Sequence, residues 1–346
     1  MVKSPGKSPR GMKPDLHRRR LLIGGAASLA GGVAGACMPR IALAPAWAQG
    51  DTTIRIGVPT KTYWPTIVAE TAIRQKLFAK EGIKADLTIY RSGAEGFEAL
   101  AAGAADLILN SSSSVAAGLR KGVNARCVAN GANGYYGWYL VVKTDSPVKD
   151  FKELAGKKVG ITSAGSGSDI CARWTIAHHK LEFTRVPLGG GGLVPNLLTG
   201  NIDATVLYSP LTYKVMDEKV ARPLIDYGAA VPAHSNSAWI ASDRIIKERP
   251  QVVQKALNAL YGGVAFLVAD ANRAAAVKLI AEIDEIPDAI AARELDGNVK
   301  NLSRTGEMQI DWMERALGMG RLIGMTDLAP ATEMFITQFK PVPTTA

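Results

Sequence analysis

The sequence predicts an α/β protein with two similar lobes, each a mostly parallel sheet flanked by helices. Short apolar runs alternate with amphipathic segments along most of the chain, a pattern typical of βαβ units. A phrase at 99–106 is echoed at 196–203, and each copy combines a helical run, a Gly stop and an Asp that opens a strand. The length of 346 residues suits about two domains of roughly 100–200 residues each.

The composition is that of an ordinary globular protein, with 47% hydrophobic and 21% charged residues. The net charge of +10 resides mostly in residues 1–48, which hold eight Lys/Arg and one acid. The remaining chain has 33 Lys/Arg against 30 Asp/Glu, a net charge of +3. The charge therefore does not support a nucleic-acid-binding domain, and we expect no nucleic-acid partner.

Residues 1–48 are predicted to be an export signal. Three arginines at 18–20 precede a Gly-rich apolar run at 21–36, which at 16 residues is shorter than the roughly 20 that a membrane-spanning helix needs. The small-x-small pattern at 46–48 is typical of a signal-peptidase site, and the paired arginines resemble a twin-arginine signal. Lipid anchoring at Cys37 is the less favoured alternative. We therefore expect a periplasmic protein.

The mature chain is predicted to contain two series of alternating strands and helices, followed by a mainly helical tail. The first series has strands at 53–59, 85–90, 106–110, 125–129 and 138–143, with helices at 64–78, 97–102 and 112–120. The second has strands at 158–162, 183–187, 204–207 and 222–226, with helices at 169–180 and 193–198. The tail has helices that begin at Pro250, Arg273 and Met308, and the first carries one apolar stripe from Val253 to Leu267.

Two cysteines, Cys127 and Cys171, remain after export. They fall in an apolar strand and an apolar helix. In an oxidising compartment they could pair, but two buried free thiols are the favoured interpretation.

Several phrases resemble the periplasmic substrate-binding proteins of nitrate/sulfonate/taurine-type ABC importers, a family that includes pyrimidine-precursor binders. They are Ile56-Gly57-Val58, the stretch KLFAKEGI at 76–83, the two Gly-x-x-Asp phrases that end at Asp106 and Asp203, and DFKELAGKKVG at 150–160. The order and spacing of these phrases carry the resemblance, which covers about residues 51–330.

The resemblance implies a type II periplasmic-binding fold with two crossover segments and a ligand cleft between the lobes. It places lobe 1 at 51–143 plus 238–346, lobe 2 at 144–237, and the crossovers near 138–143 and 235–240. It further implies a monomer that captures a small organic solute, delivers it to an ABC permease and catalyses no reaction.

The cleft residues can also be predicted from the topology. Ligands of open α/β sheets bind beyond the carboxyl ends of the strands. The side chains that follow those ends, together with the first crossover, give the candidate ligand-binding residues Tyr63, Trp64, Ser112, Ser113, Tyr135, Tyr136, Ser163, Ser166, Ser168 and Tyr208.

The serine-rich turns at 111–114 and 163–168 each lead into a helix. Free N–H groups and the helix dipole at such a position favour an anion, although Ser and Gly also serve as plain caps and turns. Because equivalent turns occur in both lobes, an organic anion such as a sulfonate or aromatic carboxylate is the favoured ligand. A neutral or cationic nitrogen heterocycle stays open, because few charged residues accompany these turns.

The tyrosine and tryptophan side chains could stack on a flat ligand body. For Trp64, core packing is an equally good interpretation. We find no dinucleotide loop, no nucleophile elbow and no convincing metal-ligand spacing, so we expect no catalytic residue, no cofactor and no metal. A periplasmic enzyme on the same fold and a sensor that signals to a membrane receptor are the alternatives.

Overall fold

Two five-stranded sheets organise the chain in the computed structural model, which describes residues 52–346. The first sheet has the order β2-β1-β3-β10-β4, with β1 Thr53–Pro59, β2 Lys84–Tyr90, β3 Leu107–Asn110, β4 Ala125–Ala132 and β10 Ser237–Ser242. The second has the order β7-β6-β8-β5-β9, with β5 Tyr139–Lys143, β6 Lys158–Ile161, β7 Thr184–Pro187, β8 Ala204–Leu207 and β9 Ala221–Asp226.

Four strands of each sheet run in one direction, and one strand opposes them. In the first sheet β1 is parallel to β2 and β3, while β10 is antiparallel to both β3 and β4. In the second sheet β6 is parallel to β7 and β8, while β5 is antiparallel to both β8 and β9. The predicted class, two mostly parallel sheets flanked by helices, is therefore confirmed.

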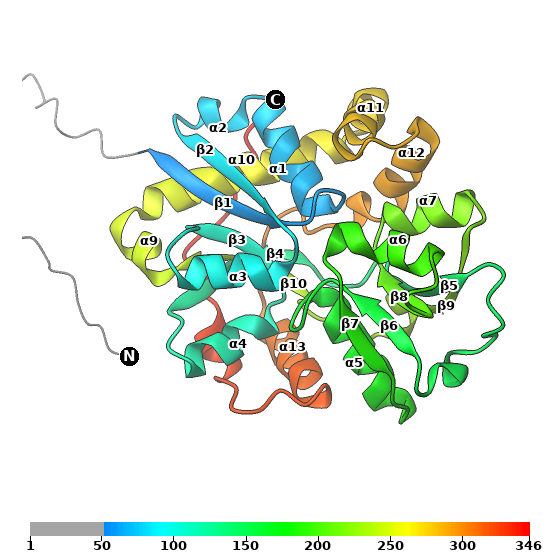
Figure 1. Ribbon diagram of the computed structural model, residues 1–346. Helices are drawn as coiled ribbons and strands as arrows, with labels where there is room; N and C mark the ends of the chain where they lie inside the picture. Colours follow the sequence, from blue (N-terminus) through cyan, green and yellow to red (C-terminus); the bar gives the residue numbers. More distant parts are fainter. Residues whose placement is uncertain (1–51) are drawn as a thin grey trace, which may run out of the picture. The chain divides into compact units, whose positions relative to one another are not determined.

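Helices cover both sheets (Figure 1). We call the first sheet with its helices the first half: α1 Trp64–Arg74, α2 Leu77–Lys80, α3 Gly93–Ala101, α4 Ser113–Arg120, α9 Asp243–Glu248, α10 Pro250–Val268, α11 Arg273–Asp284, α12 Asp288–Gly297, α13 Ile310–Leu322 and α14 Ala331–Met334. The second half holds α5 Gly167–His179, α6 Leu193–Leu198, α7 Leu211–Asp217 and α8 Tyr227–Ala230. Short 3₁₀ turns lie at Phe151–Leu154, Gly190–Gly192, Asp270–Asn272 and Val299–Asn301.

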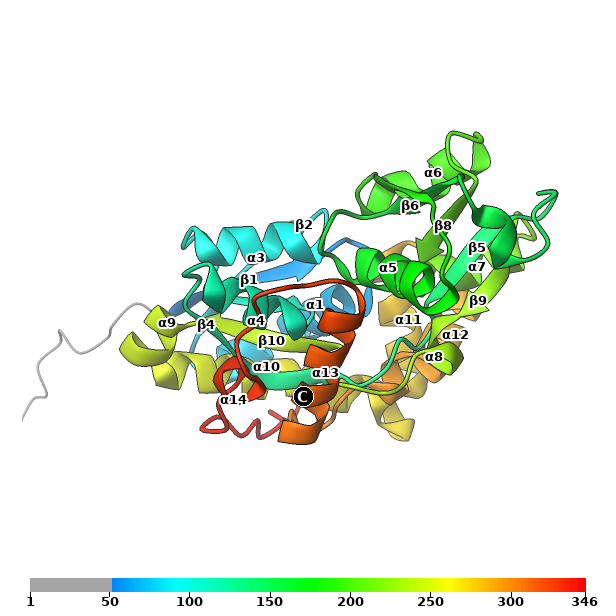
Figure 2. The ribbon, with the colours of Figure 1, turned by 90° about the horizontal axis from the view of Figure 1, so that it is seen from below.

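The chain passes between the halves twice, after β4 and after β9, and each time it enters the new sheet as the antiparallel strand. Figure 2 shows β10 among the elements of the first half, although in the chain it follows β9 of the second sheet. The expected boundary at residue 143 grouped β5 with lobe 1, whereas β5 pairs with β8 and β9 in the second sheet. The division of the chain into lobes otherwise stays a prediction.

The repeated Gly-x-x-Asp phrases do the same work in both halves. Gly103 and Gly200 end their helices with φ of +73° and +78°, a conformation that glycine adopts without strain. The carboxylate of Asp106 then accepts the backbone N–H of Arg55 on β1, and that of Asp203 accepts the N–H of Lys158 on β6. Each phrase therefore ties the end of a helix to a neighbouring parallel strand, β1 in the first sheet and β6 in the second.

Asp106 also connects β1 and α9 through ion pairs. Its buried carboxylate lies 2.7 Å from the Arg55 guanidinium and 2.9 Å from that of Arg244. Burial raises the pKa of Asp106, but the hydrogen bonds from Arg55 outweigh burial and leave it below its usual value.

The long helix α10 buries the predicted apolar stripe, with Val253, Leu257, Leu260, Val264 and Leu267 all at 5% exposure or less. Cys127 and Cys171 are buried and free, which agrees with the favoured interpretation. Within residues 52–346, no single helix is long and apolar enough to cross a membrane, although α10 passes the same test when joined to the bent segment 270–284. The expected export signal at 1–48 and Cys37 lie outside the described residues.

Candidate functional site

A small cavity lies where the carboxyl ends of β1, β3, β6 and β8 meet. Its volume is about 50 Å³, and both halves contribute to its wall. Since one water molecule needs about 10–15 Å³ of such space, the cavity has room for a few waters or one small polar group. No Lys, Arg, His, Asp or Glu is among the described residues that line it.

Aromatic rings form one wall of this cavity. Tyr63, Trp138 and Tyr208 contact one another with ring centroids 5.0–5.6 Å apart, and Tyr135 packs on Trp138 at 5.6 Å. All four side chains are buried. Tyr63 lies at the start of α1 in the first half, whereas Trp138 and Tyr208 flank strands of the second sheet, so this wall joins the two halves.

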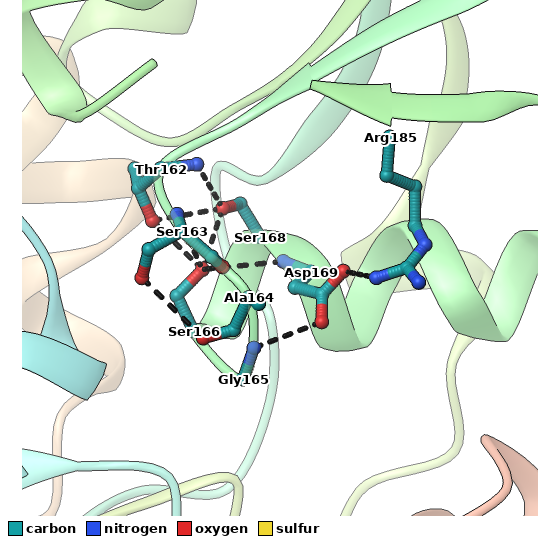
Figure 3. Close-up of polar contacts among 8 residues, drawn as sticks. All are labelled: Thr162, Ser163, Ala164, Gly165, Ser166, Ser168, Asp169 and Arg185. Atoms are coloured by element: carbon teal, nitrogen blue, oxygen red, sulfur yellow. Dashed lines mark hydrogen bonds and ion pairs between the residues drawn. The ribbon is translucent and has the colours of Figure 1, made fainter. Parts of the chain in front are cut away.

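The turn between β6 and α5, which belongs to the second half, forms another part of the cavity wall (Figure 3). The hydroxyls of Thr162, Ser166 and Ser168 lie 2.7–3.0 Å from one another, and Ser166 caps α5 by accepting the N–H of Asp169. The first N–H groups of a helix have no partner within the helix. Gly167 and Ser168 hold that position in α5 and line the cavity, so they present the positive end of the helix to it.

Asp169 fixes this turn from behind. One carboxylate oxygen accepts the N–H of Gly165 at 2.9 Å, and the other pairs with Arg185 on β7. Asp169 is 1% exposed, so Arg185 compensates a charge that is out of contact with water. Figure 3 shows the pair on the side of the turn away from Ser163.

The start of α3 forms the part of the cavity wall that the first half contributes opposite the α5 turn. Ser92 caps α3 by accepting the N–H of Glu95, and Gly93 follows it in the cavity wall. The Ser163 hydroxyl donates to Ser92 at 2.8 Å, and the Gly190 N–H donates to the Arg91 carbonyl at 3.2 Å. These two hydrogen bonds join the halves beside the cavity and hold the starts of α3 and α5 together.

Two hydroxyls of the cavity wall lie beside each other and have no other hydrogen-bond partner. They belong to Thr60, which is 6% exposed, and Tyr208, which is 2% exposed. Burial raises the pKa of Tyr208 to about 12, so its hydroxyl keeps its proton at neutral pH. A buried hydroxyl without a partner costs about 1–3 kcal/mol, so both are poised to bind a polar group in the cavity.

The structure brings five of the ten predicted site residues to the cavity: Tyr63, Tyr135, Ser166, Ser168 and Tyr208. Ser163 lies beside it and supports Ser92. The other four are Trp64, Ser112, Ser113 and Tyr136, and they do not line the cavity.

Each of those four side chains has a different local role. Trp64 packs edge-on against Trp239 in the core of the first half. The Ser112 hydroxyl lies 3.0 Å from that of Ser235 in the second crossover, and Ser113 supports Ser111 at the same distance. Tyr136 covers Gly134 in the first crossover.

Several residues that line the cavity are not among those predicted from the sequence: Thr60, Ser92, Asn110, Trp138, Thr162 and Asn236. Thr60, Ser92 and Thr162 directly follow strands or precede helices, so the rule that selected Ser166 could have found them. Trp138 was assigned to a strand, but β5 begins one residue later. Asn236 comes from the second crossover, and only the fold brings it to the site.

Nowhere in residues 52–346 do three His, Cys, Asp or Glu side chains lie together as a metal site needs. The thiol of Cys171 lies outside the lining, and burial raises its pKa well above the usual value, which makes it a poor nucleophile. The arrangement is suited to holding a small polar group between aromatic rings and helix starts.

Two sheets that exchange their antiparallel strands and enclose a cavity between them define the periplasmic-binding-protein fold. Within that class, residues 66–274 match the family described as NMT1/THI5 like, and the chain belongs to this family.

Individual proteins and solved structures are also similar to this chain. A Bacillus subtilis protein named "Putative aliphatic sulfonates-binding protein" is 25% identical over 206 residues, which cover 59% of this chain and 62% of that protein. The alkanesulfonate-binding protein SsuA from Xanthomonas axonopodis pv. citri, solved bound to MOPS, superposes with a TM-score of 0.71 at 17% identity and covers 81% of this chain and 95% of its own. The periplasmic nitrate-binding protein NrtA from Synechocystis PCC 6803 gives 0.64 at 16% identity, over 82% and 84% of the two chains.

Proposed function

We propose that this chain is a periplasmic solute-binding protein that captures a small organic anion between its halves and delivers it to an ABC permease. The protein acts as a monomer and catalyses no reaction. Sulfonates and aromatic carboxylates are the first candidate ligands. The similarity to proteins that are named for binding sulfonates and nitrate supports a solute of this charge.

The observation that carries the proposal is the meeting of two helix starts at one uncharged cavity. α3 and α5 come from opposite halves, and the first residues of both line the same cavity, at the position where the N–H groups of a helix have no partner within the helix. The unpartnered hydroxyls of Thr60 and Tyr208 add donors to the same wall. Neutral donors of this kind stabilise an anion without a lysine or arginine in contact.

The size of the cavity limits what it holds when the halves are together. About 50 Å³ accepts a sulfonate, carboxylate or nitrate-sized group. The rings of Tyr63, Trp138 and Tyr208 would cover its apolar neighbour atoms. Because such a ligand contacts both halves, it stabilises their closed arrangement, which the permease would recognise.

A thermal-shift screen of residues 49–346 tests the proposal. The panel holds sulfonates, aliphatic and aromatic carboxylates, nitrate, pyrimidines and polyamines, and each compound is also checked for turnover. A ligand at about 100 times its dissociation constant adds roughly 2.7 kcal/mol, a shift of a few degrees at this size. We expect anions to shift the melting temperature without turnover.

Other outcomes contradict defined parts of the proposal. If only pyrimidines or polyamines shift the melting temperature, the anion assignment is wrong and solute binding stands. Turnover of the bound compound means an enzyme on this fold. If nothing in the panel shifts the melting temperature and denatured protein releases no small molecule in mass spectrometry, solute capture is wrong.

A further inference from the structure

Two buried carboxyl groups lie together outside the ligand cavity. Asp284 ends α11 and Glu294 lies in α12, and they are 3% and 0% exposed. Neither oxygen of Asp284 has a hydrogen-bond partner. Glu294 accepts one hydrogen bond from Asn298 at 2.7 Å, and its other oxygen has none. Burying such a pair as charged carboxylates is much less favourable in free energy than burying it as protonated carboxyls.

The second half supplies much of the surroundings of this pair. Asp284 acts electrostatically on Tyr208, and Glu294 acts on Tyr213 of α7 and lies beside Ser209. The side chains of Tyr208 and Ser209 are buried, and Ser209 lies beside Glu294, where its hydroxyl partly offsets the effect of burial on the pKa of that carboxyl. The carboxyls thus belong to the first half, while the hydroxyls that face them belong to the second.

The same interface contains a direct contact between α12 and α7. The Arg293 guanidinium lies 4.9 Å over the ring of Tyr213 and 3.8 Å from the carboxylate of Asp217. Tyr213 also fills the space left by Gly297, where a Cβ would collide with its hydroxyl. Separation of the halves would therefore open the wall around Glu294 and Asp284 to water.

Few opposite charges are available to stabilise ionised carboxylates here. The charged and titratable groups that face the pair are Lys61, Glu285, Arg293, Asp217, Tyr208 and Tyr213. Lys61 is already paired with Glu285 at 2.5 Å, and Arg293 is directed to Asp217 and Tyr213. Burial first and mutual repulsion second raise the pKa of Asp284, and burial raises that of Glu294.

We propose that Asp284 and Glu294 form a proton-binding site between the two halves, so that closure takes up protons and separation releases them. This rests on the proposed function, because the motion concerned is the closure that a solute would stabilise. A group that binds a proton only in the closed form shifts the equilibrium toward closure as the pH falls. Solute affinity would accordingly rise in acid and fall in alkali.

Small-angle X-ray scattering of the ligand-free protein tests this site directly. We expect the radius of gyration to be smaller at about pH 5.5 than at about pH 9, where the proton occupancy of the site differs most. Asp284→Asn with Glu294→Gln carries the neutral form permanently, so its radius should match the acid value of the wild type at both pH values. Asp288→Asn is the matched control, because it removes an exposed carboxylate from the same helix α12 and should keep the full shift.

A wild-type radius that does not change with pH overturns the proposal, and so does an equal shift in the double variant. Should the double variant fail to fold, infrared difference spectra of the wild type replace it. A protonated-carboxyl band that disappears in step with the change in radius supports the site, and absence of that band at about pH 6 overturns it. Because no ligand is used, the result is independent of the solute screen: a failed screen leaves the proton site standing, and a failed pH shift leaves solute binding standing.

Discussion

At the scale of single residues, the hydroxyls of Thr60 and Tyr208 should have different effects on the free energy of unfolding and on solute affinity. Their hydroxyls are buried beside each other and have no other hydrogen-bond partner. Thr60→Val and Tyr208→Phe remove these groups, so each should leave the free energy of unfolding unchanged or raise it by about 1 kcal/mol. Each substitution should also lower the affinity for the solute by about ten-fold, which corresponds to roughly 1.4 kcal/mol. Urea unfolding and calorimetric titration measure the two effects.

Thr71→Val is the matched control for that experiment. Its hydroxyl in α1 is equally buried and equally unpartnered, but Thr71 does not line the cavity. We expect the same effect on unfolding and no effect on solute affinity. If all three variants change affinity alike, the unpartnered hydroxyls of the cavity have no special role.

Tyr63 and Trp64 are neighbours in the sequence with different roles. Tyr63 precedes the first turn of α1 and lines the cavity, whereas Trp64 lies inside the helix and packs against Trp239. Trp64→Leu should therefore lower the free energy of unfolding by about 2 kcal/mol through lost packing and leave solute affinity within two-fold. Chemical denaturation and titration of one preparation decide this, and a large affinity loss in a stable variant would return Trp64 to the site.

At the scale of elements, the start of α5 depends on the pair between Asp169 and Arg185. Arg185→Met leaves a buried carboxylate uncompensated, which should lower the free energy of unfolding by about 3 kcal/mol. The same negative charge next to the cavity should lower the affinity for an anionic solute. Asp169→Asn added to Arg185→Met removes that charge, so most of both losses should be recovered. If the double variant binds as poorly as the single one, the charge at this helix start does not influence the solute.

The element scale also shows what sequence patterns could predict. Strongly periodic or repeated segments were predicted correctly: the apolar stripe of α10 is buried, and both Gly-x-x-Asp phrases end a helix and open a strand. α7 and α12 were not predicted. α12 has Arg293, Glu294 and Asp296 close together and shows no clear apolar face, because Glu294 is buried as a polar group.

Some of the residues that line the cavity were predicted from the sequence, and others were not. Parallel sheets place every strand end at one edge, so the correct loops could be selected from strand positions alone. Which serine of a loop faces the cavity depends on rotation within a single turn. Ser111 faces it, while Ser112 turns to Ser235 and Ser113 to Ser111. Residues from the crossovers, such as Asn236, reach the site only through the pairing of β10 with β3 and β4.

For the whole molecule, the two halves are joined by few polar contacts beside the cavity. Ser163 with Ser92 and Gly190 with Arg91 are single hydrogen bonds, and the pair between Arg293 and Asp217 is largely exposed. Exposed pairs of this kind contribute about 0–1 kcal/mol each. These polar contacts alone therefore contribute little to the free energy that holds the halves together.

The buried carboxyls also determine how global stability responds to pH. The pKa of Asp284 is raised to about 8 and that of Glu294 to about 7, whereas both titrate near pH 4 in an unfolded chain. Between these values the unfolded chain releases protons that the folded protein keeps. The stability that these two carboxyls contribute is therefore fully present below about pH 4 and declines as the pH rises toward 8.

His234 acts in the opposite direction over part of that range. Burial lowers its pKa, so it contributes stability above its unfolded pKa, and that contribution is lost as the pH falls through the folded value. A comparison between proteins isolates the carboxyls from this histidine. The free energy of unfolding of Asp284→Asn with Glu294→Gln should be close to the wild-type value at about pH 4 and exceed it by a few kcal/mol at about pH 8. Urea unfolding at several pH values measures this difference, and parallel pH curves for the two proteins would show that the carboxyls are not buried in protonated form.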